Sequence, residues 1–205
     1  MELIKISSKH LFSPRRETIY WVKKAIKQIS KSKTKKIKVL DLFAGSGIIG
    51  ILVLKNIKNS VVHFGEIDKN ALKAVKENLE KNKIGKKRYK IIKTNVFSNI
   101  KEKYNFILAN PPYIAPENRF FVQESVLKNE PKRALFSKDK GLYHIKKLII
   151  GAKKHLKEGG ALYFEFDHYH KNLLENFLKE QENLKYKICK DQFKKFRYCK
   201  VLFFD

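Results

Sequence analysis

The chain alternates between short apolar runs and longer stretches whose apolar residues recur at helical spacing. Short runs rich in β-branched and aromatic residues, bounded by turn-forming or lysine-rich segments, are typical of buried strands. Seven such runs lie at 37–43, 61–67, 89–94, 104–109, 161–166, 184–190 and 198–204. Helical spacing predicts helices at about 17–30, 48–58, from Asp68 onwards, 140–157 and 170–181.

Strands that alternate with helices predict an α/β fold with a doubly wound, mostly parallel sheet of seven strands and an antiparallel C-terminal strand. We expect one domain over residues 1–205, in which a lead and helix (1–30) precede a core from residue 37. Residues 110–139 are expected to form a long irregular segment, and in compact domains such segments are usually functional. Phe120 and Phe121 in this segment could stack on the bases of a nucleic acid, but packing in the core is the favoured prediction.

Composition favours a globular protein with one core. The 205 residues are 43% hydrophobic, no stretch approaches the roughly 20 apolar residues that span a bilayer, and the first residues lack a signal-peptide apolar region. Cys189 and Cys199 are too few for a four-cysteine metal site and are expected to serve as small apolar side chains. These features predict a metal-free, cytoplasmic protein without a membrane partner.

The formal net charge of +26 raises the possibility of a nucleic-acid partner. However, lysine is spread along the whole chain, and arginine, which forms the forks that read bases and phosphates, is scarce. The charge is therefore compatible with ribosome, RNA or protein partners and selects none of them.

A glycine turn follows the first strand. In the sequence Asp-x-Phe-x-Gly-x-Gly, from Asp41 to Gly47, the glycines let a ligand approach the bare backbone. Glu66 ends the next strand about twenty residues later, where a carboxylate can accept the ribose hydroxyls of a nucleotide. Either feature alone is a weak signal, but their separation favours a nucleotide site.

Two further strands end in candidate site residues. Asn95 and Val96 follow the third strand, where a purine amino group and ring could bind, although an ordinary turn asparagine is an equally good interpretation. The fourth strand ends at Asn110-Pro111-Pro112-Tyr113. Proline nitrogens cannot donate hydrogen bonds, so this corner offers acceptors that can hold a planar amino group by its two hydrogens. Because strand carboxyl ends meet at one edge of such a sheet, these features are expected to converge on one crevice.

At this point the chain resembles the class I S-adenosylmethionine-dependent methyltransferases, which have a Rossmann-like core, and specifically the HemK/PrmC protein-glutamine N5-methyltransferases. The segments that carry the resemblance cover nearly the whole chain. They are Phe12–Thr18 (Phe-Ser-Pro-Arg-Arg-Glu-Thr), Asp41–Gly47, Glu66–Leu72 with Asn78, Asn110–Ile114, Glu130–Leu135, Gly141-Leu142, and Gly159-Gly160 through Glu165.

The resemblance implies N5-methylation of the glutamine in the Gly-Gly-Gln motif of peptide chain release factors, which act in translation termination, with S-adenosyl-L-methionine as the cofactor. It implies a catalytic role for Asn110, Pro111, Pro112 and Tyr113. It implies cofactor binding by Thr18, Phe43, Ala44, Gly45, Ser46, Gly47, Glu66, Asn95, Val96 and Asn110.

Three departures from the family pattern stand out. Scarcely a dozen residues precede the first motif, where family members commonly carry a helical domain, and shorter members use a small activator protein, which makes such a subunit a candidate partner. Asn95 replaces a usual aspartate, and His170 replaces a common glutamine. Because Asn-Pro-Pro-Tyr is shared with enzymes that methylate amino groups of bases, N6-adenine or N2-guanine methylation of ribosomal RNA or another nucleic acid is the alternative function.

Overall fold

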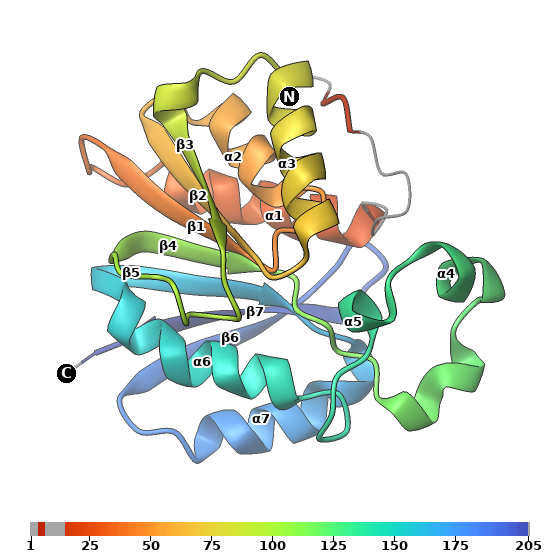
Figure 1. Cartoon of the computed structure of the whole chain (residues 1–205). Coiled ribbons are helices and arrows are strands. Elements are labelled where there is room, and N and C mark those ends of the chain that lie inside the picture. Colours follow the sequence, from red (N-terminus) through yellow and green to blue (C-terminus); the bar gives the residue numbers. More distant parts are fainter. Residues whose placement is uncertain (1–3, 7–14, 205) are drawn as a thin grey trace.

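The computed structural model describes residues 4–6 and 15–204, and these residues form a seven-stranded sheet with helices on both faces (Figure 1). The strands are β1 (Ile37–Leu42), β2 (Ser60–Glu66), β3 (Tyr89–Lys93), β4 (Tyr104–Ala109), β5 (Leu156–Glu165), β6 (Leu184–Lys190) and β7 (Phe196–Phe203). The longer helices are α1 (Arg16–Ile29), α2 (Ile48–Asn56), α3 (Lys69–Lys81), α6 (Tyr143–His155) and α7 (Lys171–Lys179). The shorter ones are η1 (Lys86–Arg88), η2 (Pro116–Phe121), α4 (Glu124–Asn129), α5 (Lys132–Leu135) and η3 (His168–His170).

The strand order in this sheet is β3-β2-β1-β4-β5-β7-β6. The first five of these strands pair in parallel, whereas β7 runs antiparallel to both β5 and β6. The predicted doubly wound sheet with an antiparallel C-terminal strand is therefore confirmed. The order reverses between β1 and β4, and at such a switch point the crossovers diverge and leave a crevice beyond the strand ends.

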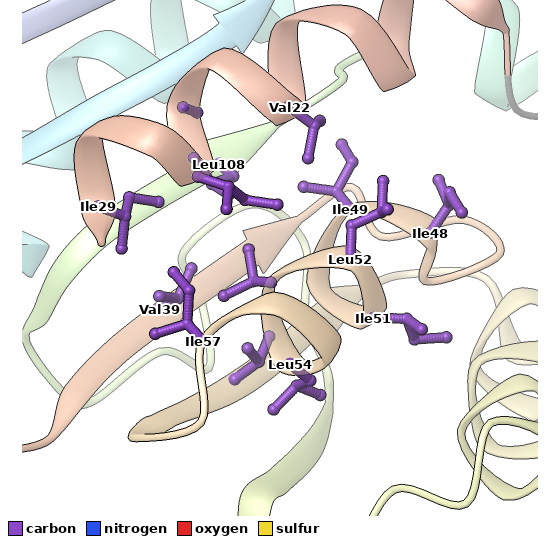
Figure 2. Packing of buried hydrophobic residues seen from close by; sticks show 14 of the residues in the cluster. Val22, Ile29, Val39, Ile48, Ile49, Ile51, Leu52, Leu54, Ile57 and Leu108 are labelled. Atoms are coloured by element: carbon purple, nitrogen blue, oxygen red, sulfur yellow. The ribbon is translucent and has the colours of Figure 1, made fainter. Parts of the chain in front are cut away.

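The sheet is covered on both faces, which explains why its central strands are mostly apolar. Successive side chains of β1 point to opposite faces: Val39 packs with α1, α2 and α3, whereas Leu40 packs with α6 and α7. Figure 2 shows the first of these two cores, in which Val22 of α1 lies beside Ile49 of α2. This double layer fixes the strand ends that carry the candidate site.

The start of α3 confirms one local prediction. The Asp68 carboxylate accepts hydrogen bonds from the backbone nitrogens of Asn70 (2.8 Å) and Ala71 (3.1 Å), so it is the N-cap of this helix. The cap directs the chain away from the sheet immediately after Glu66.

The strand after α6 begins earlier than predicted. The Gly159-Gly160 pair suggested a turn before a strand at 161–166, yet β5 starts at Leu156, whose partner is Tyr104. The pairing register shifts between Tyr104 and Phe106, and Gly159 has a φ of +68°. The glycines therefore form an irregularity within the strand, as in a β-bulge.

The segment 110–139 differs from its prediction in two respects. It holds three short helices, η2, α4 and α5, and it folds back so that Ile114 pairs with Phe136. The prediction that Phe120 and Phe121 pack in the core is wrong, because their exposed fractions are 93% and 88%. They lie on η2, whose six residues do not complete an apolar face that could be buried.

Cys199 of β7 is buried and Cys189 of β6 is half-buried, and both are free. Cys189 pairs with Tyr198 and Cys199 with Ile188, so the two cysteine side chains point to opposite faces of the sheet. No helix within residues 4–6 and 15–204 is long and apolar enough to cross a membrane. The single-domain boundaries and the cytoplasmic location stay predictions.

Candidate active site

A cavity of about 350 Å³ lies at the carboxyl ends of β1 to β4, beside the switch point of the sheet. Its size is in the range of small-molecule sites. Its walls include twelve of the thirteen site residues predicted from sequence. These are Thr18, Phe43, Ala44, Gly45, Ser46, Glu66, Asn95, Val96, Asn110, Pro111, Pro112 and Tyr113. The expected convergence of the four strand ends on one crevice is therefore what the structure shows.

The two glycines of the β1–α2 turn have different surroundings. Gly45 has a φ of +54°, and a Cβ atom added to it would meet nothing within 4 Å, so its backbone is open to a ligand. Gly47 has a φ of +79°, does not line the cavity, and would bring a Cβ atom within 3.3 Å of Val75. Gly47 therefore allows α2 to start tightly against α3.

Glu66 closes the base of this turn. Its Oε2 accepts from the backbone nitrogen of Gly45 (3.0 Å), and its Oε1 accepts from those of Ile67 (2.8 Å) and Asp68 (3.0 Å). A carboxylate offers about four acceptor positions, so one position on Oε2 remains for a ligand hydroxyl. Glu66 thus both holds the turn and presents an acceptor to the cavity.

The loop after β3 contributes a strained residue. Val96 has a φ of +51°, which is rare for a β-branched residue, and Thr94 Oγ1 donates to its carbonyl oxygen (2.9 Å). Backbone strain of this kind concentrates at ligand sites. The exposed Asn95 precedes Val96, and both residues line the cavity.

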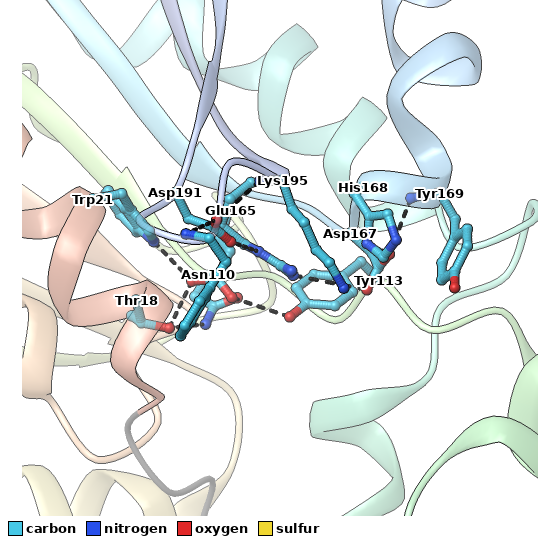
Figure 3. A network of polar contacts seen from close by, with 12 residues as sticks. Thr18, Trp21, Asn110, Tyr113, Glu165, Asp167, His168, Tyr169, Asp191 and Lys195 are labelled. Carbon is cyan, nitrogen blue, oxygen red and sulfur yellow. Dashed lines mark hydrogen bonds and ion pairs between the residues drawn. The ribbon is translucent and has the colours of Figure 1, made fainter.

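The Asn110–Tyr113 corner forms the opposite wall, and a buried polar network stands behind it (Figure 3). Asn110 Nδ2 donates to Thr18 Oγ1 over 3.4 Å, and the Tyr113 hydroxyl donates to Glu165 Oε1 over 3.1 Å. Burial raises the pKa of Tyr113 well above its ordinary value, so its hydroxyl keeps its proton. The corner is therefore held from α1 and β5 as well as by its prolines.

Glu165, at the end of β5, is the centre of this network, and sequence reasoning did not include it among the site residues. It is 1% exposed, and its Oε2 accepts from Thr18 Oγ1 (2.6 Å) and Trp21 Nε1 (2.7 Å). Burial raises the pKa of Glu165, although its hydrogen-bond donors oppose this shift. Glu165 shares with Glu66 the position at the end of an apolar strand, but this signal alone is weak, and for Glu66 it was strengthened by the glycine turn about twenty residues earlier.

The segment after the corner closes the cavity from outside. Ile114 donates to the Leu135 carbonyl (2.9 Å), and Arg133 lies 3.4 Å from Asp68 at the start of α3. Arg133 and Asp68 both line the cavity, and their ion pair joins the segment after Tyr113 to the start of α3. Arg133 belongs to the Glu-Pro-x-x-Ala-Leu segment that the sequence singled out.

Asp41 lies beneath the glycine turn and does not line the cavity. Its Oδ2 accepts from the Gly50 backbone nitrogen (2.8 Å), whereas its buried Oδ1 has no hydrogen-bond partner. Burial, with a smaller contribution from Glu66, raises the pKa of Asp41 well above its ordinary value of 3.8. The fold therefore favours the protonated carboxyl group.

We expect Asp41→Asn to stabilise the protein increasingly as the pH rises. A folded-state pKa above the unfolded one confers stability that is full below the unfolded pKa and is lost as the pH rises through the folded pKa. Because asparagine stays neutral, the Tm of the variant minus that of the wild type should increase between about pH 4 and pH 8. Thermal unfolding measures this, with Glu117→Gln, on the exposed η2, as the control for the lost charge. A difference that is flat or falls with pH would contradict the assignment.

Comparisons with known proteins agree with this geometry. The sequence model of the methyltransferase small-domain family matches residues 25–138. A release factor glutamine methyltransferase of Lactococcus lactis subsp. lactis is 34% identical over 152 residues, which are 74% of this chain and 54% of that protein. One of Borreliella burgdorferi is 36% identical over 160 residues, which are 77% of this chain and 54% of that protein. The chain thus spans about half the length of the curated relatives it matches.

Solved structures share the fold at low sequence identity. The ribosomal protein L11 methylase of Lactobacillus delbrueckii subsp. bulgaricus superposes with a TM-score of 0.66 at 20% identity, covering 95% of this chain and 82% of that one. The hMettl16 catalytic domain, solved with an RNA hairpin, gives a TM-score of 0.74 at 16% identity, covering 98% and 76%.

Proposed function

The chain belongs to the methyltransferase small-domain family, and from that premise we propose that it methylates a glutamine side-chain amide of a peptide chain release factor with S-adenosylmethionine. The glutamine is the one in the Gly-Gly-Gln motif that the sequence resemblance implies. One observation carries the proposal: an acceptor-rich corner at Asn110 and a nucleotide-type turn at Gly45 face the same cavity. Relatives that match three quarters of the chain are named for this activity, which supports it.

The residues of the cavity fit the cofactor. The open backbone at Gly45 leaves room for a ligand, and Glu66 retains an acceptor position for a ribose hydroxyl. Asn95 and Val96, at the next strand end, would contact the adenine ring. Thus the nucleotide half of the cofactor would lie along the ends of β1 to β3, and its methionine half towards Asn110.

Glu66→Gln is expected to weaken cofactor binding by about 10- to 100-fold, since each hydrogen bond to a charged group contributes about 1.5–3 kcal/mol. All three partners of Glu66 in the fold are N–H donors, and a glutamine amide nitrogen cannot accept from them. Calorimetric titration gives the Kd, and Glu117→Gln makes the same charge change outside the cavity. An unchanged Kd would remove Glu66 from the cofactor site.

At the end of the cavity where the substrate would bind, this chain would supply hydrogen-bond acceptors. When bound, S-adenosylmethionine would supply an electrophilic methyl group to the glutamine nitrogen and be left as the neutral thioether, and the amide proton would pass to water. The Asn110 side-chain oxygen and the Pro111 carbonyl would accept the two N–H hydrogens of the glutamine. Such acceptors orient the nitrogen lone pair and stabilise the positive charge that develops as it attacks.

The substrate identity is tested by transfer of labelled methyl groups to purified release factor and, in parallel, to ribosomal RNA. We expect label on the release factor, located by mass spectrometry on the Gly-Gly-Gln peptide, and no label when that glutamine is replaced. Label on RNA alone would overturn the proposal in favour of base methylation. Activity of the purified chain alone would show that the candidate activator subunit is not required.

A further inference from the structure

The hydrogen bonds behind the corner determine which way the Asn110 amide faces. We infer that Thr18 and Glu165 are positioning residues, which turn the Asn110 side chain so that its oxygen, not its nitrogen, is the atom offered to the substrate. The inference rests on the proposed function and assigns Thr18 a role other than direct cofactor binding. Three steps lead to it.

The first step establishes that Glu165 Oε2 is a hydrogen-bond acceptor. Trp21 Nε1 can only donate, and it donates to Glu165 Oε2 over 2.7 Å. This oxygen must therefore be an acceptor and cannot carry a proton towards Trp21. If Glu165 binds a proton, Oε1 is available for it, because the Tyr113 hydroxyl beside Oε1 can rotate and accept. The acceptor character of Oε2 is thus independent of the charge on Glu165.

The second step establishes the direction of the Thr18 hydroxyl hydrogen. A hydroxyl group has one hydrogen, and that of Thr18 points to Glu165 Oε2 over 2.6 Å. What remains on Thr18 Oγ1 is acceptor capacity. Thr18 is 1% exposed, so little of it is left to contact a ligand directly.

The third step establishes the orientation of the Asn110 side-chain amide. Because Thr18 Oγ1 can only accept on this side, the Asn110 group that faces it must be the donor Nδ2, at 3.4 Å. The reversed amide would place Oδ1 against an oxygen lone pair, which is unfavourable in a buried network. Oδ1 is then the polar atom of Asn110 left to meet an incoming N–H group, and Asn110 lines the cavity.

The direct test compares Thr18→Val with Thr18→Ser. Valine keeps the shape of threonine but removes the hydroxyl, so kcat should fall about tenfold or more, the effect of about 1.4 kcal/mol. KM for the release factor and the cofactor Kd should change less than about threefold. Serine keeps the hydroxyl and should restore most of kcat. Equal activity of the two variants would overturn the inference.

A second pair tests the acceptor on β5. In Glu165→Gln the amide oxygen can take the place of Oε2 while the amide nitrogen donates to Tyr113, whereas Glu165→Leu leaves Trp21 and Thr18 without an acceptor. We expect the leucine variant to lose at least about ten times more kcat than the glutamine variant. Ser60→Ala, which removes a buried hydroxyl at the start of β2, controls for general loss of stability. Similar losses in both Glu165 variants would contradict the role of an acceptor.

A readout without substrate separates this inference from the proposed function. In the folded wild type, nuclear magnetic resonance of the Asn110 side-chain amide should show slow proton exchange, because Nδ2 is hydrogen-bonded inside the network. Exchange should accelerate in Thr18→Val and not in Thr18→Ser. If release factor is not methylated yet this pattern holds, the proposed function fails and the positioning stands. If exchange is the same in all three proteins, the positioning fails.

Discussion

Asn110→Ala is expected to lower kcat by about 100- to 1000-fold, the usual loss when one preorganised group that stabilises transition-state charge is removed. The substitution deletes the side-chain oxygen that would hold the substrate amide and leaves the glycine turn untouched. Because the proposed nucleotide contacts lie at the ends of β1 to β3, the cofactor Kd should stay within about threefold of that of the wild type.

Single-turnover kinetics with saturating cofactor would measure this loss. Asn95→Ala is the matched control, because it removes a second asparagine side chain from the same cavity but at the nucleotide end. We expect it to raise the cofactor Kd more than it lowers kcat. An Asn110→Ala protein that loses cofactor affinity and kcat equally would show that Asn110 serves the cofactor.

Gly141→Ala is expected to destabilise the protein by about 2–5 kcal/mol. Gly141 has a φ of +88°, where an L-residue costs about 1–2 kcal/mol, and steric overpacking adds about 1–3 kcal/mol. The added Cβ atom would lie 2.3 Å from the Tyr113 carbonyl oxygen, a backbone atom that cannot simply rotate away. The change therefore strains the Asn110–Tyr113 corner itself.

Two other glycines separate the causes of this effect. Gly159 also has a positive φ (+68°) but no atom within 4 Å of an added Cβ, and Gly85 has neither feature, with a φ of −64°. In urea unfolding, Gly85→Ala should be nearly neutral, Gly159→Ala should lose about 1–2 kcal/mol, and Gly141→Ala should lose the most. A Gly141→Ala protein as stable as Gly159→Ala would show that the segment relaxes around the methyl group.

The sequence predicted the sheet well because the central strands are buried on both faces and are therefore mostly apolar. Val39 and Leu40 face opposite cores, so neither position can be polar. The starts of strands were harder to predict, because a glycine such as Gly159 in β5 is also typical of a turn. The exposure of Phe120 could not be predicted, because hydrophobic residues are usually buried and the pattern says nothing of a segment that projects from the core.

The candidate site was predictable where its residues follow strands in the chain. Glu66 and Asn110 each end an apolar run, which places them at one edge of a parallel sheet. Glu165 was missed because its importance comes from partners 147 and 144 residues away, Thr18 and Trp21, and only the folded structure brings these together. The structural role of Gly47, which leaves room for the Val75 side chain, likewise depends on a tertiary contact.

The residues of the Glu165 hydrogen-bond network lie far apart in the sequence, and this has a consequence for the synthesis of the protein. The strands of the nucleotide half lie before residue 94, and Asn110 follows soon afterwards, but the acceptor that orders Thr18 is at residue 165. A nascent chain arrested before β5 leaves the ribosome already contains the glycine turn. It still lacks Glu165, so the side-chain amide of Asn110 is not yet oriented. The hydrogen-bond network behind the Asn110–Tyr113 corner is therefore complete only after β5 has been made.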